Sequence, residues 1–507
     1  MKNNIFFFVR TIRYLCSAAM HMFWSNPKHF KAQVKERLRQ TDKRWLWRMG
    51  GDTKGNSTRS EFEFLVSIGE LSRALTIDDS SFIERRRVIE QINLLAMEPA
   101  TGGPGEKRSD SRILAFVTNS LPHTLSGYSV RSQHVFEAIA GAGIEVFAAT
   151  RLGYPLNVGK IARSHQELVS SIKYFRLIPK KHNASLSIRL NEEVDLLTRL
   201  AEETHPSVLY TTTDFRNALV VSRVADRLGI PWIYEVRGEP EKTWLTRVPV
   251  GFKERAKNSE YYSKRRALET KAMLASNAVT TLSEVSKKSL VERGVPASKI
   301  WVVPNCVDGS LLENTICNES AREKLGLPEG KWVGTVTSVV EYEGLDTLLD
   351  AILYLPSDIN ILIVGDGVAL PSLQRKAQEM RINHRVRFVG RKPRDEIQDW
   401  YAALDLFVVP RKNLEVCRTV TPIKAMEAMA MGIPVVASDL PAIREVTGDC
   451  AEYFRPEDPR SLAKAIETAL VDRSLVSRGR EWASSRTWDH AAVIYQELLT
   501  HLMDAGR

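Results

Sequence analysis

The most constraining feature of this chain is the regular alternation of short apolar segments with longer helical ones from residue 112 onward. Strands are predicted at 113–118, 145–150, 333–336 and 361–364, and helices between them, such as 129–142. This order predicts parallel sheets with helices on both faces. Because 507 residues are too many for a single core, we expect two α/β domains of this kind.

The rest of the chain is expected to form appendages to these domains. The hydrophobic fraction of 43% and the charged fraction of 26% are ordinary for a soluble globular protein. Thr58-x-x-Glu61 and Ser81-x-x-Glu84 predict two helix starts with capping boxes, in a scaffold or docking element. The predicted organisation is a basic amphipathic arm (1–50), a helical extension (51–97), a linker (98–111), an N-terminal domain (112–307), a C-terminal domain (308–482) and a C-terminal crossover helix (483–507) that returns to the first domain.

The segment 408–439 is the most informative part of the chain for function. It is predicted to form a strand, a basic loop, a helix and a second strand at 435–438. Thr421 is an N-cap candidate, and Pro422 suits the first helical position because its missing N–H is not needed there. Gly432 follows the helix as a C-terminal stop. We therefore expect a helix whose N-terminus faces the basic loop.

Cations gather around this predicted helix start. Arg411, Lys412 and Arg418 lie in the loop, and Lys424 lies in the first turn. Free N–H groups and the helix dipole favour an anion at such a place, above all a phosphate. Glu427 adds one carboxylate that can accept hydrogen bonds from hydroxyl groups. This combination suggests a sugar nucleotide, although each cation could equally be a solvated surface residue.

The stretch EAMAMGIPVVASD, at 427–439, resembles the C-terminal domain of retaining glycosyltransferases of the group-one (family four) type. The T-P-x-K sequence at 421–424 resembles one subgroup of that family. The resemblance extends over about residues 112 to 505 and includes the VPNCVD run at 303–308. It implies the GT-B fold, in which two doubly wound Rossmann-like domains face a cleft, here with an N-terminal helical extension.

Three positions depart from the family's pattern. The family commonly carries two glutamates separated by seven residues; Glu427 is the second, but Thr419 stands at the first, which usually touches the donor sugar. Relatives often place an Arg and a Lys at the positions of Ser338 and Glu343 to hold the diphosphate. A histidine common near the reacting centre is replaced by YTTT at 210–213, and threonine is a poor general base.

From these residues we predict a division of roles. Cations can stabilise a departing nucleoside diphosphate where its charge develops, while Glu427 accepts hydrogen bonds from the ribose. Because the usual charges at Ser338 and Glu343 are missing, the basic loop is expected to compensate. The predicted leaving-group cations are Lys424, Arg411 and Arg418; the predicted donor-binding residues are Gly127, Ser338, Thr419, Thr421 and Glu427; and Glu235 and Arg237 are predicted to contact the acceptor or to form an interdomain salt-bridged loop.

The predicted function is transfer of a sugar from a nucleotide-sugar donor to a glycan or lipid-linked acceptor, in cell-surface polysaccharide synthesis. Retention of anomeric configuration is implied by the resemblance alone. No D-x-D motif is present, so no metal and no cofactor are expected. Two alternatives stay open, a nucleotide-sugar epimerase of the same fold and a non-catalytic partner subunit.

The basicity of the chain resides in its N-terminal arm. Residues 1–50 hold eleven Lys or Arg against Glu36 and Asp42, a net charge of 11 − 2 = +9, which leaves 10 − 9 = +1 for the remainder. Arg10 and Arg13 belong to one face of a predicted helix that is otherwise strongly apolar. Its longest stretch without Lys or Arg is too short to span a bilayer as a helix. The favoured interpretation is an interfacial helix on an anionic membrane; the alternative is a helix docked on the protein itself.

Compartment and partners follow from composition. The five cysteines are scattered without a C-x-x-C pair, which argues against a disulfide framework or zinc site and favours a reducing cytosol. The arm has no recognisable nucleic-acid-binding fold, so no nucleic-acid partner is expected. We predict a cytoplasmic protein, peripheral at the inner face of the membrane.

Overall fold

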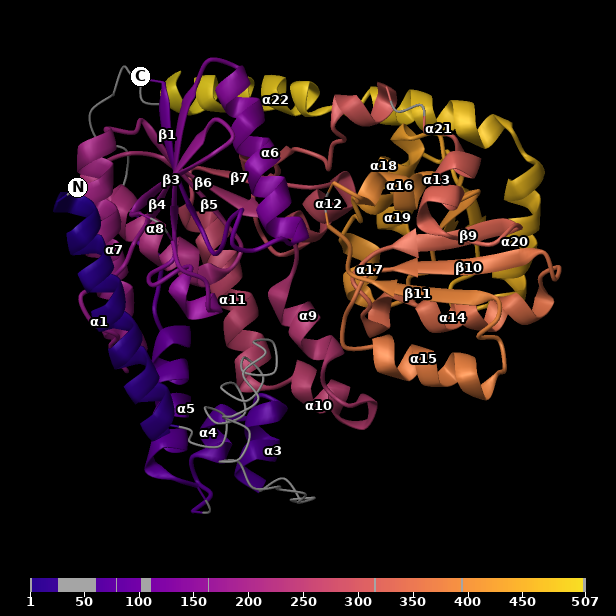
Figure 1. The fold of residues 1–507 in the computed structure, drawn as a ribbon. Coiled ribbons are helices and arrows are strands. Elements are labelled where there is room, and N and C mark those ends of the chain that lie inside the picture. The colour runs from indigo at the N-terminus through magenta and orange to yellow at the C-terminus, as the bar shows by residue number, and fades with distance from the viewer. Residues whose placement is uncertain are drawn as a thin grey trace. The chain divides into compact units, whose positions relative to one another are not determined.

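The computed structural model describes residues 2–25, 61–101 and 111–504, except positions 79, 163, 314, 315 and 394. The second half of the basic arm, the Thr58 capping box and most of the predicted linker lie outside the described residues. The chain divides into two compact units (Figure 1). The first comprises 1–235, 243–279 and 502–507, and the second 236–242 and 280–501.

An eight-stranded sheet has the order β3-β4-β2-β1-β5-β6-β7-β8. Parallel ladders join β4 through β2, β1 and β5 to β6, and the edge pair β3 and β4 is antiparallel. Most strand residues are buried, as expected where helices cover both faces. The strands are β1 (Arg112–Val117), β2 (Glu145–Thr150), β3 (Gln166–Val169), β4 (Ile172–Arg176), β5 (Val208–Thr212), β6 (Trp232–Val236), β7 (Ala278–Thr281) and β8 (Ile300–Val302).

Helices connect these strands in the predicted alternation. Asp214 caps α8 by accepting a hydrogen bond from the Arg216 N–H at 3.2 Å, and Gly229 ends that helix in the left-handed region. The helices are α6 (Gly127–Gly141), α7 (Leu186–Thr204), α8 (Phe215–Leu228), α9 (Pro240–Thr246), α10 (Lys253–Lys257), α11 (Glu260–Ala275) and α12 (Glu284–Glu292).

The extension before β1 forms three helices, α3 (Glu61–Ser67), α4 (Leu71–Ala74) and α5 (Phe82–Leu95). The predicted capping box at the start of α5 is confirmed, with Ser81 Oγ accepting from the Glu84 N–H at 3.3 Å and Glu84 Oε2 accepting from the Ser81 N–H at 2.8 Å. Glu90 then accepts a hydrogen bond from the Leu186 N–H at the start of α7, at 2.9 Å. The extension is thus tied to the first unit.

The second unit contains a six-stranded, wholly parallel sheet of order β11-β10-β9-β12-β13-β14. Its strands are β9 (Lys331–Val336), β10 (Ile359–Val364), β11 (Val386–Gly390), β12 (Leu406–Val409), β13 (Val435–Ser438) and β14 (Glu452–Phe454). Its helices are α13 (Asn318–Leu325), α14 (Leu345–Ala351), α15 (Leu370–Glu379), α16 (Ile397–Ala402), α17 (Glu415–Thr419), α18 (Lys424–Ala430), α19 (Pro441–Thr447), α20 (Pro459–Val471), α21 (Ser474–Ser484) and α22 (Trp488–Asp504). Two apolar cores, one on each side of this sheet, follow from the nearly continuous burial of its strands.

Helix α1 (Lys2–Ser25) docks on the first unit. Its buried residues Phe7 and Tyr14 pack with Leu156, Ala162 and Ile178, which come from the loops after β2 and β4. The backbone N–H of His182 donates a hydrogen bond to Ser17 Oγ at 2.7 Å. The docked alternative for this segment is therefore present in the structure, while membrane binding stays a prediction. Within the described part of the chain, no helix combines the length and apolar character that crossing a bilayer requires.

Candidate functional site

The local structure of 408–439 differs in part from the prediction. The basic loop contains a helical turn, α17, and the following helix α18 begins at Lys424 rather than at Pro422. The prediction of Thr421 as the N-cap is wrong, because its hydroxyl and carbonyl oxygens accept hydrogen bonds from Asn305 Nδ2 at 3.3 and 3.1 Å. Ile423 occupies the cap position without a side-chain hydrogen bond. The predicted strand 435–438 is confirmed as β13.

Lys424, Glu427 and Tyr401 form a hydrogen-bonded chain at the start of α18. Lys424 Nζ and the Tyr401 hydroxyl both donate to Glu427 Oε2, at 3.1 and 2.7 Å. Burial, and then the charge of Glu427, raise the pKa of Tyr401 well above its ordinary value, so the hydroxyl stays a donor. Among the described residues none donates to Glu427 Oε1. This oxygen is available to a ligand, and Tyr401 is a positioning residue that sequence reasoning missed.

Arg411 has a carboxylate partner of its own. Its guanidinium binds Glu343 through Nη2 at 2.9 Å and Nε at 3.2 Å, and Nη1 donates to the Val420 carbonyl at 2.8 Å. Burial acts to lower the pKa of Arg411, but Glu343 raises it overall, so the guanidinium stays charged. Glu343, which stands where relatives often carry Lys, therefore neutralises Arg411 and fixes the loop that precedes α18. The role of Arg411 toward a phosphate stays a prediction.

The other two cations of the loop differ from each other. Lys412 pairs with Asp346 at 2.8 Å. Arg418 is exposed, and its Nε donates to the amide oxygen of Asn413 at 2.7 Å. Among the described residues it has no carboxylate within ion-pair distance. Arg418 thus retains its full positive charge for an incoming anion.

A buried charge cluster lies beside Thr419, the position where the family usually has glutamate. Thr419 Oγ1 donates to Glu239 Oε1 at 3.2 Å. The same carboxylate binds Lys242 at 2.8 Å and Arg293 at 3.4 Å, and Arg293 also binds Glu241 at 3.0 Å. All of these residues belong to the second unit. No motif in the sequence marks Glu239, which is 180 residues from Thr419 in the chain.

Glu235 and Arg237 are both buried. In the first unit, Glu235 is fully enclosed, binds Arg131 Nε at 2.8 Å and accepts a hydrogen bond from the Tyr210 hydroxyl. Glu235 thus forms a salt bridge within the first unit, on strand β6 rather than in an interdomain loop. Acceptor contact by either residue stays a prediction.

Two loops at strand ends contain the remaining predicted donor residues. In the first unit, Gly127 begins α6 behind the Ser126 cap, and a Cβ there would meet no atom within 4 Å, which leaves open space. In the second unit, Ser338 is exposed in the loop after β9. That loop packs backbone to backbone on Gly365 and Gly367, where a Cβ would collide with the Thr337 and Val339 carbonyl oxygens. Glycine is therefore required at both positions for this close approach.

In place of a histidine, β5 of the first unit leads into an ion-paired network. Arg151, just after β2, binds Asp214 at 2.5 Å and Asn217 at 2.7 Å. Burial acts to raise the pKa of Asp214, but Arg151, Arg216 and Arg265 lower it overall, so the carboxylate is charged. An ionised aspartate paired with arginine is a poor general base, and this network is best explained as a structural one.

All five cysteines are free thiols. In the described part of the chain, His, Cys, Asp and Glu side chains form no group of three or more that could hold a metal ion.

Family comparisons cover both halves of the chain. Residues 126–306 match the glycosyl transferase 4-like domain, and residues 330–472 match the glycosyl transferases group 1 family, together more than half of the chain. A D-inositol 3-phosphate glycosyltransferase of Xylanimonas cellulosilytica is 28% identical over 44% of this chain and 57% of its own length. The lipopolysaccharide core biosynthesis mannosyltransferase LpsB of Rhizobium meliloti is 29% identical over 38% and 56%. The matches thus span little more than half the length of these relatives.

Solved structures share the fold. A sucrose-phosphate synthase from Thermosynechococcus elongatus superposes with a TM-score of 0.63 at 20% identity, over 78% of this chain and all of its own. HepE of Anabaena, solved with UDP and glucose, gives a TM-score of 0.61 at 18% identity, over 77% and 99%. The predicted α/β GT-B fold is confirmed by these neighbours and by the two parallel-dominated sheets. The chain belongs to the group 1 glycosyltransferases.

Proposed function

We propose that this protein is a glycosyltransferase that moves a sugar from a nucleotide-sugar donor to a glycan or lipid-linked acceptor, with retention of anomeric configuration. The observation that carries this proposal is the arrangement of Lys424 and Glu427 at the start of α18. Tyr401 holds one carboxylate oxygen of Glu427, while the other is unoccupied by described residues and Lys424 stands beside it. A cation next to an anchored, half-available carboxylate suits a nucleotide whose phosphates and ribose hydroxyls must be held together.

The chemistry assigned to these groups is electrostatic. When the sugar–phosphate bond breaks, negative charge grows on the departing diphosphate, and preorganised cations lower the barrier. Lys424 and Arg418 would contact the diphosphate. Arg411, neutralised by Glu343, would act by holding the loop through the Val420 carbonyl. The donor set consists of cations rather than a metal-ligand cluster, so we propose transfer without a metal ion or cofactor.

Glu239 is proposed to supply the carboxylate that Thr419 lacks. The resemblance implies that the first glutamate of the family's pair touches the donor sugar. Glu239 Oε1 accepts a hydrogen bond from Thr419 Oγ1, so a carboxylate lies next to the substituted position. Lys242 and Arg293 pair directly with this carboxylate.

Substrate class and location are proposed from the relatives. HepE was solved with UDP and glucose, which supports a nucleoside diphosphate sugar as donor. LpsB acts in lipopolysaccharide core biosynthesis, and a Mycobacterium tuberculosis relative at 26% identity is a GDP-mannose-dependent mannosyltransferase for a phosphatidylinositol monomannoside. These activities support a role in cell-surface polysaccharide or glycolipid synthesis. We place the protein in the cytoplasm, peripheral at the inner face of the membrane.

A screen of nucleotide sugars for thermal stabilisation tests this function, followed by assay of the stabilising donor with candidate glycan and lipid-linked acceptors. A ligand that binds the folded state raises apparent stability, so one class of nucleotide sugar should raise the unfolding temperature. Product that carries the transferred sugar with retained configuration supports the transferase. Interconversion of free donor sugars would instead support the epimerase, and stabilisation by no donor would support a non-catalytic subunit.

A further inference from the structure

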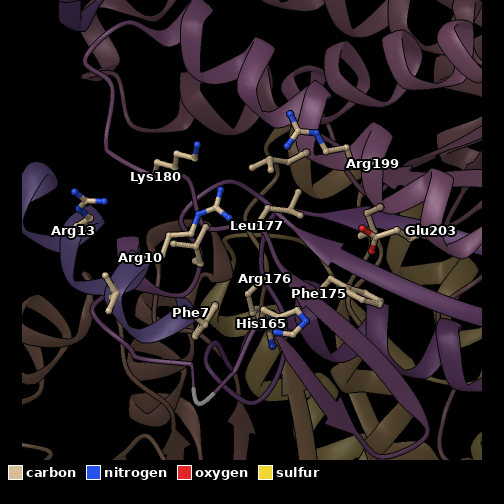
Figure 2. Close-up of a pocket in the computed structure, with 14 residues that line it drawn as sticks. Phe7, Arg10, Arg13, His165, Phe175, Arg176, Leu177, Lys180, Arg199 and Glu203 are labelled. Atoms are coloured by element: carbon tan, nitrogen blue, oxygen red, sulfur yellow. The ribbon is translucent and has the colours of Figure 1, made fainter. Parts of the chain in front are cut away.

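A cavity of about 630 Å³ lies in the first unit between α1, the segment that follows β4, and α7; we call it the α1–α7 pocket. Figure 2 shows Arg10, Lys180 and Arg199 with their charged ends on one side of it, and Phe7, His165 and Phe175 on the other. None of these residues belongs to the proposed donor site. The pocket therefore requires a separate explanation.

Four cations in this pocket lack a protein counter-ion at close range. Arg10 and Arg13 come from α1, Lys180 from the segment after β4 and Arg199 from α7, while Glu203 is the one carboxylate among the lining residues. Among the described residues, none has a carboxylate within ion-pair distance of these four side chains. Arg10 is half-buried, and its Nε has no hydrogen-bond acceptor in the part of the chain that the structure describes. The pocket consequently carries an excess of positive charge, four cations against Glu203.

The electrostatics of Arg10 agree with this arrangement. Burial lowers the pKa of Arg10, Glu192 acts in the opposite direction, and the like charge of Arg199 lowers it again. Arg176, a fifth basic residue of the lining, differs because Glu167 pairs with it at 2.7 Å. An anion placed between Arg10 and Arg199 would relieve their repulsion, as Glu167 does for Arg176.

The opposite wall of the pocket is apolar. Phe7 and Phe175 line it beside His165, and the cations face this surface across the cavity. On the outer side of α1, Ile12 and Met20 are 45% and 60% exposed. A small hydrophilic anion would satisfy the cations but leave both apolar surfaces in water. An amphiphile with an anionic head matches both the cations of the pocket and the apolar surfaces beside them.

We propose that the α1–α7 pocket binds the phosphate-bearing headgroup of an anionic membrane lipid. The phosphate would lie against Arg10, Lys180 and Arg199, with the glycerol region along Phe7 and Phe175. The exposed apolar side chains of α1 would enter the acyl boundary. This inference deepens the proposed peripheral location, on which it rests, and it assigns half of the lipid site to the body of the first unit rather than to the basic arm.

Vesicle flotation of the full chain tests the proposal. The probe is phosphatidylcholine vesicles with about one third phosphatidylglycerol, compared with phosphatidylcholine alone. The test variant is Lys180→Glu/Arg199→Glu, whose positions are exposed and lie off α1. The control is Lys257→Glu/Lys288→Glu, which makes the same change in net charge at exposed lysines outside the pocket. Each variant is shown to be folded if its unfolding temperature matches that of the wild type. The nucleotide-sugar donor should also raise that temperature by the same amount as in the wild type.

The wild type is expected to float with the anionic vesicles and not with phosphatidylcholine alone. Because each basic residue near an anionic surface contributes about fivefold to binding, the test variant should lose about 25-fold or more and the control less than about threefold. The exchange Lys180→Arg/Arg199→Lys should retain binding. An equal loss of binding in the test and control variants would overturn the proposed lipid site, because it would show that the protein is attracted to the anionic surface by its overall positive charge.

Two further outcomes would also overturn the lipid proposal. Release of the protein from anionic vesicles by millimolar inorganic phosphate or glycerol 3-phosphate would identify a site for soluble phosphate instead. If the wild type does not float with anionic vesicles, both the proposed lipid site in the pocket and the proposed peripheral location are wrong. Sugar transfer to a detergent-dispersed acceptor would be unaffected in that case, so failure of the lipid site is distinguishable from failure of the transferase.

Discussion

Basic side chains gather in two regions of this molecule, the loop before α18 in the second unit and the α1–α7 pocket in the first. There, Arg411 and Lys412 of the loop and Lys424 at the start of α18 each pair with a carboxylate of the same unit, while Arg418 has only the Asn413 amide oxygen as partner among the described residues. In the pocket, four cations have no such partner among the described residues. The three paired cations are held in place by the protein itself, whereas the cations of the pocket can be paired only by an anion that comes from outside.

The comparison also separates buried pairs from exposed ones. Arg411 and Glu343 are both about 10% exposed at their side chains, while Asp346 is 39% exposed in its pair with Lys412. Removing one member of a buried pair leaves the other charge without a partner in the protein interior, where water does not solvate it. When an exposed pair is broken, water solvates the remaining charge and largely replaces the lost partner. The predictions below use this difference, beginning with the largest effect.

Substitution Glu343→Ala should lower the free energy of unfolding by about 3–5 kcal/mol, because Arg411 would stay buried without a counter-ion. The matched control, Asp346→Ala, breaks the neighbouring pair with Lys412 and should cost less than about 1 kcal/mol. Denaturant titration of both variants measures the difference. Equal, small effects would mean that Arg411 is solvated, and the pairing would then have no structural role.

Lys424→Ala should reduce kcat/KM for sugar transfer by about 100-fold or more, the loss typical of one preorganised donor to a developing charge. Lys412→Ala is the control, since it removes a cation of the same loop that Asp346 already neutralises, and it should change the rate less than about threefold. Steady-state kinetics with saturating acceptor compare the two. Full transfer activity in Lys424→Ala would remove this residue from the leaving-group site.

The sequence predicted the fold well because the signals for it are local. Alternation after residue 112 and the run at 427–439 depend on neighbouring residues, and the strands and the Ser81 capping box were confirmed. The same holds for the C-terminal helix, predicted within 483–507 and found at Trp488–Asp504.

The site was predicted less completely, because its geometry depends on contacts distant in sequence. Glu343 reaches Arg411 across 68 positions, and Asn305 engages Thr421 across 116, which displaces the expected helix cap. A propensity for capping cannot reveal a competing amide from another segment. For the same reason, the docking of α1 through Phe7 could be weighed only as an alternative before the structure was known.

Glu239→Gln tests whether the carboxylate beside Thr419 serves the donor sugar. Glu241→Gln is its control, because Arg293 binds both carboxylates and both are buried. The two variants should lose similar stability, but only Glu239→Gln should lower kcat, by about tenfold, since a neutral amide cannot stabilise positive charge on the sugar. Parallel losses of activity and stability in both variants would assign Glu239 a structural role alone.

The smallest effect is expected at Tyr401, whose hydroxyl holds Glu427 but is not proposed to contact substrate. Tyr401→Phe should raise the donor KM about fivefold with kcat little changed, because one net hydrogen bond of about 1 kcal/mol no longer orients the carboxylate. Tyr453→Phe removes a different hydroxyl of the same unit, hydrogen-bonded to Thr447, and should leave KM unchanged.

A pH series separates this positioning role from simple packing. The pKa of Tyr401 is raised well above 10.0 in the folded protein, so its protonated form adds stability that is fully present below pH 10.0 and is lost as pH rises through the folded-state pKa. Tyr401→Phe lacks this group, and its stability should therefore decline less steeply above pH 10.0 than that of the wild type. Identical alkaline profiles would show that Tyr401 is solvated. Glu427 would then be oriented by Lys424 alone. The donor site would in that case resemble the α1–α7 pocket, because a bound ligand would be needed to fix the positions of its charged side chains.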